Sequence, residues 1–383
     1  MKVLIVSHPC VTPINQQFYA EIQSQTGWEM TVVVPSNWTS EYDGKPLKPS
    51  QWPEYQGRLL TIPVWLPGNI PLHIYRSSFV GLLKEIEPDV IYMNHEPYGA
   101  ATAQVFLANY LSIRKPIGFL TWQNISKQYP FPFQQMQTFV FRQSKFAFAG
   151  SRSVEKVLRK KGYSGDCVLL PYGLDSNIYF PRPEADALKS KLRTSDNEIL
   201  IGYMGRIVEE KGLKTFIHAL EKIQDLPWRM IVVGSGSYQS EFTNMVDSLR
   251  LSDRVDCLGY VPHEEAPIYL TAFDMLVLPS ETRPNWKEQF GRVIIESMAC
   301  MTPVVGSNSG EIPNLIRETG GGLVFPEGEP DALAEQLKQL ILDDSLRTQI
   351  AHDGHKTVRA EYDTAAISHR FIQEINRVAH RPT

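Results

Sequence analysis

The sequence predicts two α/β domains in tandem, each built on a parallel sheet that is covered by helices. The length of 383 residues exceeds what a single hydrophobic core usually organises. Short apolar runs alternate with amphipathic stretches along the chain, which is the pattern of parallel strands joined by helical crossovers. This alternation occurs twice, and a stretch with several Pro residues at 171–195 separates the two series.

The first series predicts five buried strands, because its apolar runs are too continuous for a sheet with one wet face. They cover residues 3–6, 30–34, 90–93, 117–120 and 146–149. Helical spacing of apolar residues lies between them at 79–86, 102–113 and 153–161. The segment 37–71 has poor periodicity and many turn-forming residues, so we expect long loops there with one or two added strands. Residues 1–180 are therefore expected to form one domain.

The second series predicts a further parallel sheet in a domain over 181–363. Its expected strands cover residues 199–204, 230–233, 254–258, 275–278, 303–306 and 322–325. The last segment, 364–380, carries a helical stripe that includes Ile367, Phe371 and Ile375. That stripe predicts a final helix packed on one of the two domains.

Composition and charge exclude several classes of protein. The content of 43% apolar and 21% charged residues is typical of a soluble globular chain, and a net charge of −4 disfavours a nucleic-acid partner. Residues 1–180 hold 16 Lys and Arg against 12 Asp and Glu, whereas the remainder holds 22 against 30, so the two domains differ in charge.

The four Cys form no CxxC pair, which predicts reduced thiols and no zinc ribbon. No apolar run is long enough for an export signal or a membrane span, so we expect a cytoplasmic protein. Peripheral attachment at the inner face of the membrane stays open.

The first cluster with chemical meaning is the stretch 205–212, between an expected strand and an expected helix. Gly205 permits a tight turn, and Arg206 and Lys211 place two cations beside a helix N-terminus. Arg binds an oxyanion through two parallel hydrogen bonds and Lys binds it as a point charge, so this cluster predicts a diphosphate site. The alternative is that both are solvated surface cations beside acidic neighbours.

The second cluster combines Glu288 and Glu296 with Gly291 at the start of an expected helix over 290–300. We expect Glu288 in the loop before that helix and Glu296 in its second turn. Carboxylates there can accept hydrogen bonds from sugar hydroxyls while backbone N–H groups near Gly291 meet phosphate. The alternative is a Glu that complements the helix dipole together with an exposed Glu on the helix surface.

A third stretch, 233–237, begins like a dinucleotide-binding fingerprint. Position 239, where the third glycine of that fingerprint would lie, is Gln239. The incomplete pattern disfavours a dehydrogenase and indicates a tight turn.

Taken together, these motifs resemble family 4 of the retaining glycosyltransferases, the glycosyl transferases group 1. The resemblance rests on the order and spacing of seven motifs, at 205–212, 233–236, 254–259, 278–280, 288–296, 303–306 and 310–313. It is specific over the second half of the chain, from about residue 199. In the first half it is limited to the strand pattern and to the stretch 171–175.

The resemblance implies a GT-B fold, with two Rossmann-like domains facing a cleft and the final helix crossing back to the N-terminal domain. It implies a nucleoside-diphosphate sugar as the donor, with a UDP-sugar expected. Arg206 and Lys211 would bind its diphosphate and stabilise the leaving group, so that neither a metal nor a cofactor is needed. Glu288 would meet the sugar and Glu296 the ribose, with the N–H groups of Phe290–Arg292 close to the donor.

The acceptor side departs from the family pattern. Many relatives carry a His after the strand that here ends at Leu120, where this chain has Gln123 and Asn124. These amides can bind sugar hydroxyls but cannot transfer protons near neutral pH. His8 and His95, at two expected strand ends, could assist the reaction or could be hydrogen-bonded loop residues.

An aromatic and basic stretch at 129–145 in the first domain has two interpretations. It could contact a membrane or a lipid-linked acceptor. Otherwise it is a Pro-rich loop followed by a helix packed on the core.

The function expected from the sequence is therefore transfer of a sugar, with retention, from a nucleoside-diphosphate sugar to a hydroxyl acceptor such as a glycan, a lipid-linked sugar or a small molecule. Two alternatives remain. A sugar-nucleotide 2-epimerase of the same fold would need catalytic carboxylates and a His, and it would not explain the paired motifs at 205–212 and 288–296. A non-catalytic nucleotide-sugar-binding scaffold would not need all four charged residues of those motifs.

Overall fold

The computed structural model describes residues 1–40 and 44–380, and the chain divides into two compact units. The first unit comprises Met1–Pro171 together with Ala365–Thr383, and the second comprises Tyr172–Thr364. The sequence placed the boundary at residue 180. The stretch after Pro171 belongs to the second unit because Leu174 donates a backbone hydrogen bond to the carbonyl of Tyr362 (2.7 Å) and accepts one from Thr364 (2.9 Å).

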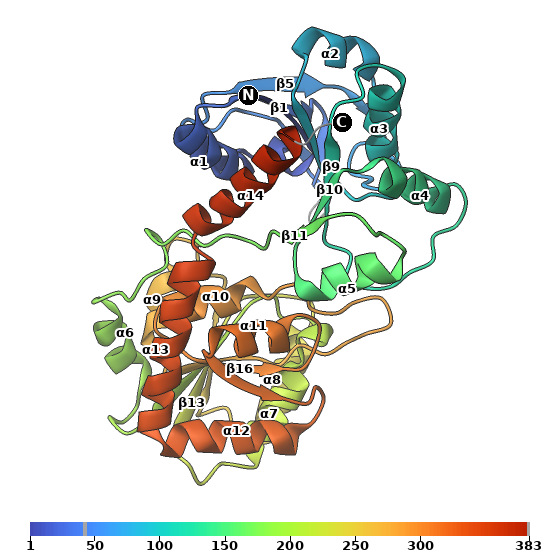
Figure 1. The fold of residues 1–383 in the computed structure, drawn as a ribbon. Coiled ribbons are helices and arrows are strands. Elements are labelled where there is room, and N and C mark those ends of the chain that lie inside the picture. Colours follow the sequence, from blue (N-terminus) through green and yellow to red (C-terminus); the bar gives the residue numbers. More distant parts are fainter. Residues whose placement is uncertain (41–43, 381–383) are drawn as a thin grey trace. The chain divides into compact units, whose positions relative to one another are not determined.

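The first unit contains a sheet of seven parallel strands in the order β11-β10-β9-β8-β1-β2-β5 (Figure 1). The strands are β1 Lys2–Ser7, β2 Glu29–Pro35, β5 Arg58–Ile62, β8 Val90–Asn94, β9 Ile117–Thr121, β10 Phe146–Ala149 and β11 Cys167–Leu169. All five predicted strands are present. The two that the sequence did not reveal, β5 and β11, lie at the edges, where partial exposure shortens the apolar run.

Short elements occupy the poorly periodic segment and its surroundings. Two antiparallel pairs form there, β3 Trp38–Thr39 with β4 Pro46–Leu47, and β6 Val64–Trp65 with β7 Ile74–Tyr75. Residues 41–43 of that segment lie outside the described part of the chain. Two 3₁₀ turns follow β1, η1 Pro9–Val11 and η2 Pro13–Gln16.

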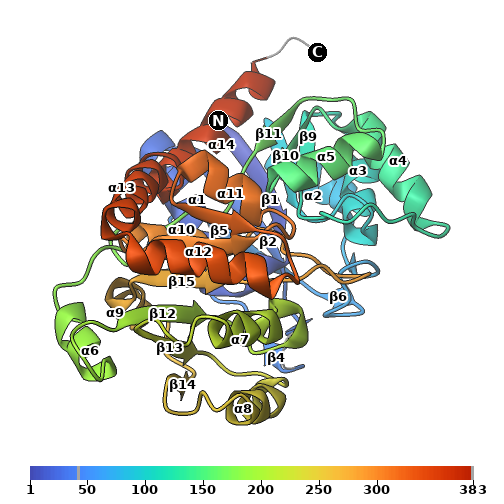
Figure 2. The ribbon, with the colours of Figure 1, turned by 90° about the horizontal axis from the view of Figure 1, so that it is seen from below.

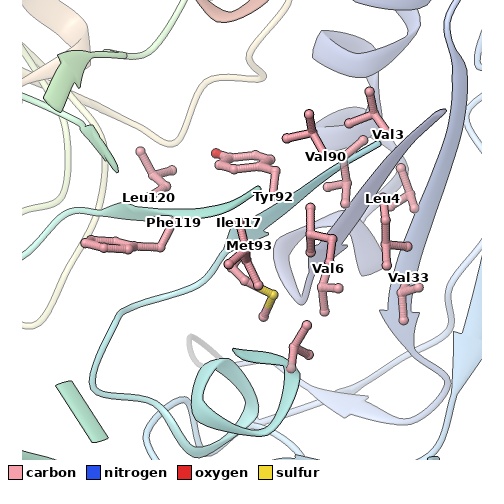
Figure 3. Packing of buried hydrophobic residues seen from close by; sticks show 14 of the residues in the cluster. Val3, Leu4, Val6, Val33, Val90, Tyr92, Met93, Ile117, Phe119 and Leu120 are labelled. Carbon is pink, nitrogen blue, oxygen red and sulfur yellow. The ribbon is translucent and has the colours of Figure 1, made fainter. Parts of the chain in front are cut away.

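The helices of the first unit cover its sheet, and the last of them comes from the end of the chain. They are α1 Gln17–Thr26, α2 Phe79–Ile86, α3 Ala100–Leu111, α4 Phe133–Gln143, α5 Arg152–Lys160 and α14 Thr364–Ala379. Ile367, Phe371 and Ile375 of α14 are buried in the same core as β1, β8 and β9, whose side chains Figure 3 shows packed together. The ring of Phe371 stacks on that of Phe148, with centroids 5.3 Å apart. The predicted return of the final helix to the N-terminal domain is confirmed.

The second unit repeats the architecture with six parallel strands in the order β14-β13-β12-β15-β16-β17. The strands are β12 Ile199–Met204, β13 Trp228–Val233, β14 Val255–Gly259, β15 Met275–Leu278, β16 Val304–Ser307 and β17 Gly322–Phe325. The helical elements are α6 Ala185–Leu192, η3 Glu209–Lys211, α7 Leu213–Glu221, α8 Gln239–Ser248, α9 Ala266–Ala272, α10 Arg292–Ala299, α11 Ile312–Thr319, α12 Pro330–Leu342 and α13 Asp344–Glu361. Helices α7 and α12 lie against each other in this unit (Figure 2). Among the described residues, no helix combines the length and apolar character needed to cross a bilayer.

In each sheet there is one pair of adjacent strands from which the chain connections lead in opposite directions along the sheet, a topological switch point. In the first unit this place lies between β1 and β8, and in the second it lies between β12 and β15. The loops at the carboxyl ends of such strands diverge and leave room for a ligand. The topology therefore indicates one candidate position in each unit.

Candidate functional site

The loops after β12 and β15 are held against each other in the second unit. Gly212, at the end of the loop after β12, has φ +69°, and a Cβ there would collide with the carbonyl oxygen of Pro279. The N–H of Glu281 donates to the carbonyl of Glu210 at 2.8 Å. The glycine that follows Lys211 in the sequence motif is therefore required for this close approach of two backbones.

Lys211 and Glu288 meet at this junction. The Lys211 Nζ lies 2.6 Å from Glu288 Oε2, and the Ser280 hydroxyl donates to the same oxygen at 2.9 Å. Their side chains are only 14% and 10% exposed, so the ion pair is largely shielded from water. The Lys211 Nζ also lies 5.3 Å from the centre of the Trp286 ring, within range of a cation–π interaction. The structure thus brings together one residue from each of the two predicted clusters.

Backbone contacts fix the main chain at Glu288. The N–H of Glu311 donates to the Glu288 carbonyl at 3.2 Å. A Cβ at Gly310 would collide with that carbonyl, so only glycine allows the approach. The loop after β16 therefore fixes the backbone from which the Glu288 side chain extends.

Helix α10 begins beside this carboxylate. It starts at Arg292, two residues later than the sequence predicted, because Gly291 adopts a left-handed conformation (φ +82°) as its N-cap. Phe290 is buried and anchors the turn. The first backbone N–H groups of α10 have no carbonyl partner within the helix and form a position suited to anions.

Glu296 lies in the second turn of α10, as predicted, and its side chain is 12% exposed. Arg292 lies one turn before it, with Nη2 3.4 Å from Glu296 Oε1, and Tyr179 and His263 also interact with this carboxylate. Burial nevertheless raises the pKa of Glu296 above its usual value. The Tyr179 hydroxyl lies 3.0 Å from His263 Nδ1.

Arg206, like Arg292, is an exposed member of the predicted donor residues. Its carbonyl accepts a hydrogen bond from the Tyr203 hydroxyl at 2.5 Å, which fixes the turn at Gly205. The charges of both Arg206 and Glu288 influence Tyr203, so the exposed guanidinium belongs to the same neighbourhood as the ion pair.

Sequence reasoning did not reveal the groups that support these residues. Tyr179 comes from the stretch taken as a connection between domains, His263 from a loop without a motif, and Ser280 and Trp286 from the loop after β15. The only signal for Ser280 was its place in the motif at 278–280. The others carried no sequence signal, because only the fold places them near Glu288 and Glu296.

In the first unit, His8 and His95 follow the two strands β1 and β8 that flank the switch point. Their Nδ1 atoms lie 3.2 Å apart, and His73, which the sequence analysis did not consider, lies beside them. Burial lowers the pKa of all three imidazoles, that of His8 to about 3, and their mutual repulsion as cations adds to the effect for His8 and His95. The three rings are therefore neutral at pH 7.

Gln123 and Asn124 lie in the loop after β9. The Gln123 amide donates to the Tyr129 hydroxyl at 2.6 Å, and Asn124 is buried. The same loop is held by Glu96, which accepts hydrogen bonds from the Thr121 hydroxyl (2.7 Å) and the N–H of residue 122 (2.8 Å). These contacts hold in place the loop that carries Gln123 and Asn124.

Lys161 lies in the same region, with its Nζ 3.8 Å from the centre of the Tyr129 ring. Burial lowers the pKa of Lys161 to about 8, although the charge of Glu96 acts in the opposite direction. Burial also raises the pKa of Glu96.

The aromatic stretch at 129–145 divides into two parts. Val140 of α4 is fully buried, and Phe139 and Phe141 pack against the core of the first unit. Phe131, just before the helix, is 80% exposed. The helix thus follows the core-packing interpretation, while membrane contact through the preceding loop stays a prediction.

Comparison with known proteins agrees with these motifs. Residues 184–357 match the model of the family described as glycosyl transferases group 1. LpsE of Rhizobium meliloti, named a lipopolysaccharide core biosynthesis glycosyltransferase, is 30% identical over 185 residues, which are 48% of this chain and 52% of LpsE. A GDP-mannose-dependent alpha-(1-6)-phosphatidylinositol monomannoside mannosyltransferase of Mycobacterium tuberculosis is 26% identical over 226 residues, or 57% of this chain and 58% of the relative. The chain spans about half the length of the curated relatives it matches.

Solved structures resemble the whole chain. A sucrose-phosphate synthase of Thermosynechococcus elongatus has a TM-score of 0.72 at 19% identity and covers 99% of both chains. HepE of Anabaena, solved in complex with UDP, has a TM-score of 0.75 at 19% identity and covers 98% of this chain and 100% of its own. At such identities the likeness concerns the fold, which is the GT-B arrangement of two Rossmann-like units that the sequence predicted. The similarity to the glycosyl transferases group 1 family rests on residues 184–357.

Proposed function

We propose that this chain transfers a sugar, with retention of anomeric configuration, from a nucleoside-diphosphate sugar to a hydroxyl acceptor. The observation that carries the proposal is the junction at the β12/β15 switch point, where the Lys211–Glu288 pair (2.6 Å) lies next to the N-terminus of α10. A cation, a carboxylate and the first backbone N–H groups of a helix at one position match the phosphates and hydroxyls of such a donor.

The diphosphate is the part of the donor that the cations would bind. Lys211 carries three N–H donors, and the ion pair with Glu288 uses one of them. Arg206 is exposed beside it and offers a second positive charge. Shielding from water strengthens the charge of Lys211, and Arg206 adds a solvent-exposed charge. We assign to both the stabilisation of the departing nucleoside diphosphate, without a metal ion or cofactor.

The two carboxylates would orient the rest of the donor. Glu288 is held by Lys211, Ser280 and its own fixed backbone, so its oxygens are positioned to accept hydrogen bonds from the sugar. Glu296 would bind the ribose hydroxyls. Its raised pKa means that it becomes a full acceptor only above the pH at which it loses its proton.

Retention would follow from front-face departure. The bond between the anomeric carbon and the phosphate oxygen breaks, and the diphosphate leaves with the electron pair. The acceptor oxygen then bonds to the same face, and its proton passes to the departing phosphate. This route needs no carboxylate nucleophile and no proton-transferring side chain at Gln123 or Asn124. Gln123, which is partly exposed, would bind an acceptor hydroxyl instead, whereas Asn124 is buried.

The nucleotide base is the part of the donor to be tested. UDP is our first choice, and the Anabaena neighbour was solved with it. The mycobacterial relative is named as GDP-mannose-dependent, so GDP-sugars belong in the comparison.

The experiment is a panel of UDP-, GDP- and ADP-sugars, scored by thermal shift and by release of nucleoside diphosphate. A ligand that binds only the folded state raises the melting temperature by mass action. We expect stabilisation by one nucleotide class and slow hydrolysis of its sugar donor. Stabilisation without any sugar release, in the presence of a broad acceptor mixture, would favour a binding scaffold, and isomerisation of the donor sugar would favour the 2-epimerase.

A further inference from the structure

Three histidines converge at the switch point of the first unit. His8 follows β1, His95 follows β8, and His73 precedes β7. One ring nitrogen from each lies within 4.8 Å of those of the other two. None of the roles proposed for the second unit involves this cluster.

His73 presents a lone pair to the cluster. Its Nδ1 lies 3.1 Å from the carbonyl oxygen of Asn69 and 3.0 Å from that of Ile70. A carbonyl oxygen can only accept, so the proton of the neutral ring is on Nδ1 and Nε2 carries the lone pair. This Nε2 is buried and has no hydrogen-bond partner within the part of the chain that the structure describes. A buried acceptor without a donor is unfavourable unless another group occupies it.

His95 is oriented in a similar way. Its Nε2 lies 3.5 Å from the hydroxyl of the buried Tyr75, which leaves Nδ1 directed toward His8 at 3.2 Å. A ring whose outer nitrogen is held by an oxygen atom while its inner nitrogen faces other imidazoles is the arrangement of metal-binding histidines. Trp38 restricts the other two rings, with its centroid 5.1 Å from that of His8 and 4.9 Å from that of His73.

We propose that His8, His73 and His95 form a binding site for a divalent transition-metal ion, with Zn²⁺ the best match. Zn–N bonds of about 2.0–2.1 Å in tetrahedral geometry place ligand nitrogens roughly 3.3 Å apart. The His8–His95 separation of 3.2 Å meets this requirement already, and the wider separations, which stay within 4.8 Å, would have to shorten when the ion binds. Three neutral imidazoles favour Zn²⁺, Ni²⁺ or Cu²⁺ over Mg²⁺, which prefers oxygen ligands.

A metal there would join three segments that are distant in sequence. The loops after β1 and β8 and the segment that enters β7 would be fastened to one ion. Three protein ligands also leave the fourth tetrahedral position for water or for an oxygen of a bound molecule. The site consists of residues of the first unit alone, and no metal is proposed for the diphosphate site of the second unit.

The test is metal binding by the full-length protein without a histidine tag, after chelator treatment. Zn²⁺ is titrated calorimetrically, and Co²⁺ is followed by the visible bands of its tetrahedral complex. The variants are His73→Gln and His95→Gln, and the matched control is His352→Gln, an exposed histidine on α13 of the second unit. Mg²⁺ serves as the control ion.

We expect one equivalent of Zn²⁺ or Co²⁺ per chain in the wild type and in His352→Gln. Either ligand substitution should weaken binding at least about tenfold, and Tyr75→Phe should weaken it about tenfold to a hundredfold by releasing the His95 ring. Circular dichroism shows whether each variant is folded. If one is not, it is replaced by His8→Gln, at a half-buried position. The proposal is overturned if the wild type binds no stoichiometric metal, or if binding survives substitution of His73 and of a second ligand.

Discussion

Removing one charge of the Lys211–Glu288 pair should affect both stability and function. Lys211→Met removes the ammonium and leaves Glu288 as a carboxylate that is only 10% exposed, with the Ser280 hydroxyl at 2.9 Å on the same oxygen. Loss of one partner from a buried pair costs about 3–5 kcal/mol. Because a tenth of each side chain remains accessible and Ser280 still donates, we expect about 3 kcal/mol. For a unit of this size that corresponds to a melting temperature about 6–12 °C lower.

The double variant separates the free energy of the ion pair from the effect of changing each side chain alone. Lys211→Met and Glu288→Gln together remove both charges, so the combined loss should be smaller than the sum of the single losses by about 1–3 kcal/mol. Urea and thermal unfolding measure this coupling. The control is Lys214→Met, an exposed lysine on the adjacent turn of α7, which should change stability by less than about 0.5 kcal/mol.

The same variants distinguish the proposed role of Lys211 in nucleotide binding from that of Glu288 in sugar transfer. Lys211→Met removes a charge-assisted hydrogen bond of about 1.5–3 kcal/mol to the diphosphate, so nucleotide affinity should fall about tenfold to a hundredfold. Glu288→Gln should retain most nucleotide affinity and lower transfer at least about a hundredfold. The reasoning fails if Lys214→Met weakens the nucleotide as much as Lys211→Met does, or if the double variant loses the full sum of the single stability losses.

Three further predictions follow from packing and ionisation. Gly212→Ala should destabilise the second unit by about 1–3 kcal/mol more than Gly328→Ala. Both glycines have positive φ (+69° and +76°), but only Gly212 has no room for a Cβ. Equal losses of stability in thermal unfolding would contradict this. Phe371→Ala should cost the first unit about 3–5 kcal/mol, against little change for the exposed neighbour His369→Ala, and a similar melting temperature for both would remove α14 from the core. Lys161, whose pKa falls from 10.5 to about 8 on folding, binds fewer protons in the folded than in the unfolded state between those values, so unfolding free energy should rise with pH across that window in the wild type relative to Lys161→Met. Parallel pH profiles for wild type and variant would show that the lysine is not buried as described.

Much of the architecture follows from local patterns. The eleven strands expected from apolar runs are all present. Nine of them are inner strands, which are apolar along most of their length because both faces of the sheet are covered. The start of α10 was misjudged by two residues because the left-handed conformation of Gly291 depends on its surroundings. The edge strands β5 and β11 were missed because half-exposed strands lack that continuous pattern.

The candidate donor site was predicted only in part. Its charged residues, Lys211 and Glu288 among them, lie in motifs whose spacing is readable along the chain. The ion pair itself depends on strand order, because β12 and β15 become neighbours through a crossover that no local pattern encodes. The charged residues of the candidate donor site could therefore be predicted from the sequence, whereas their geometry depends on the order of the strands.

The histidine cluster depends more on the tertiary structure than on the sequence. His8 and His95 could be noticed at strand ends, but His73 lies in a segment without periodicity and gave no signal. Its partnership with the other two arises because the segment before β7 folds back onto the carboxyl ends of β1 and β8. By itself the sequence indicated two α/β units, the resemblance of the second unit to a glycosyltransferase family and most of the charged residues of the candidate donor site. Only the tertiary structure decided which side chains meet, because contacts between distant segments depend on strand order and loop packing rather than on local pattern.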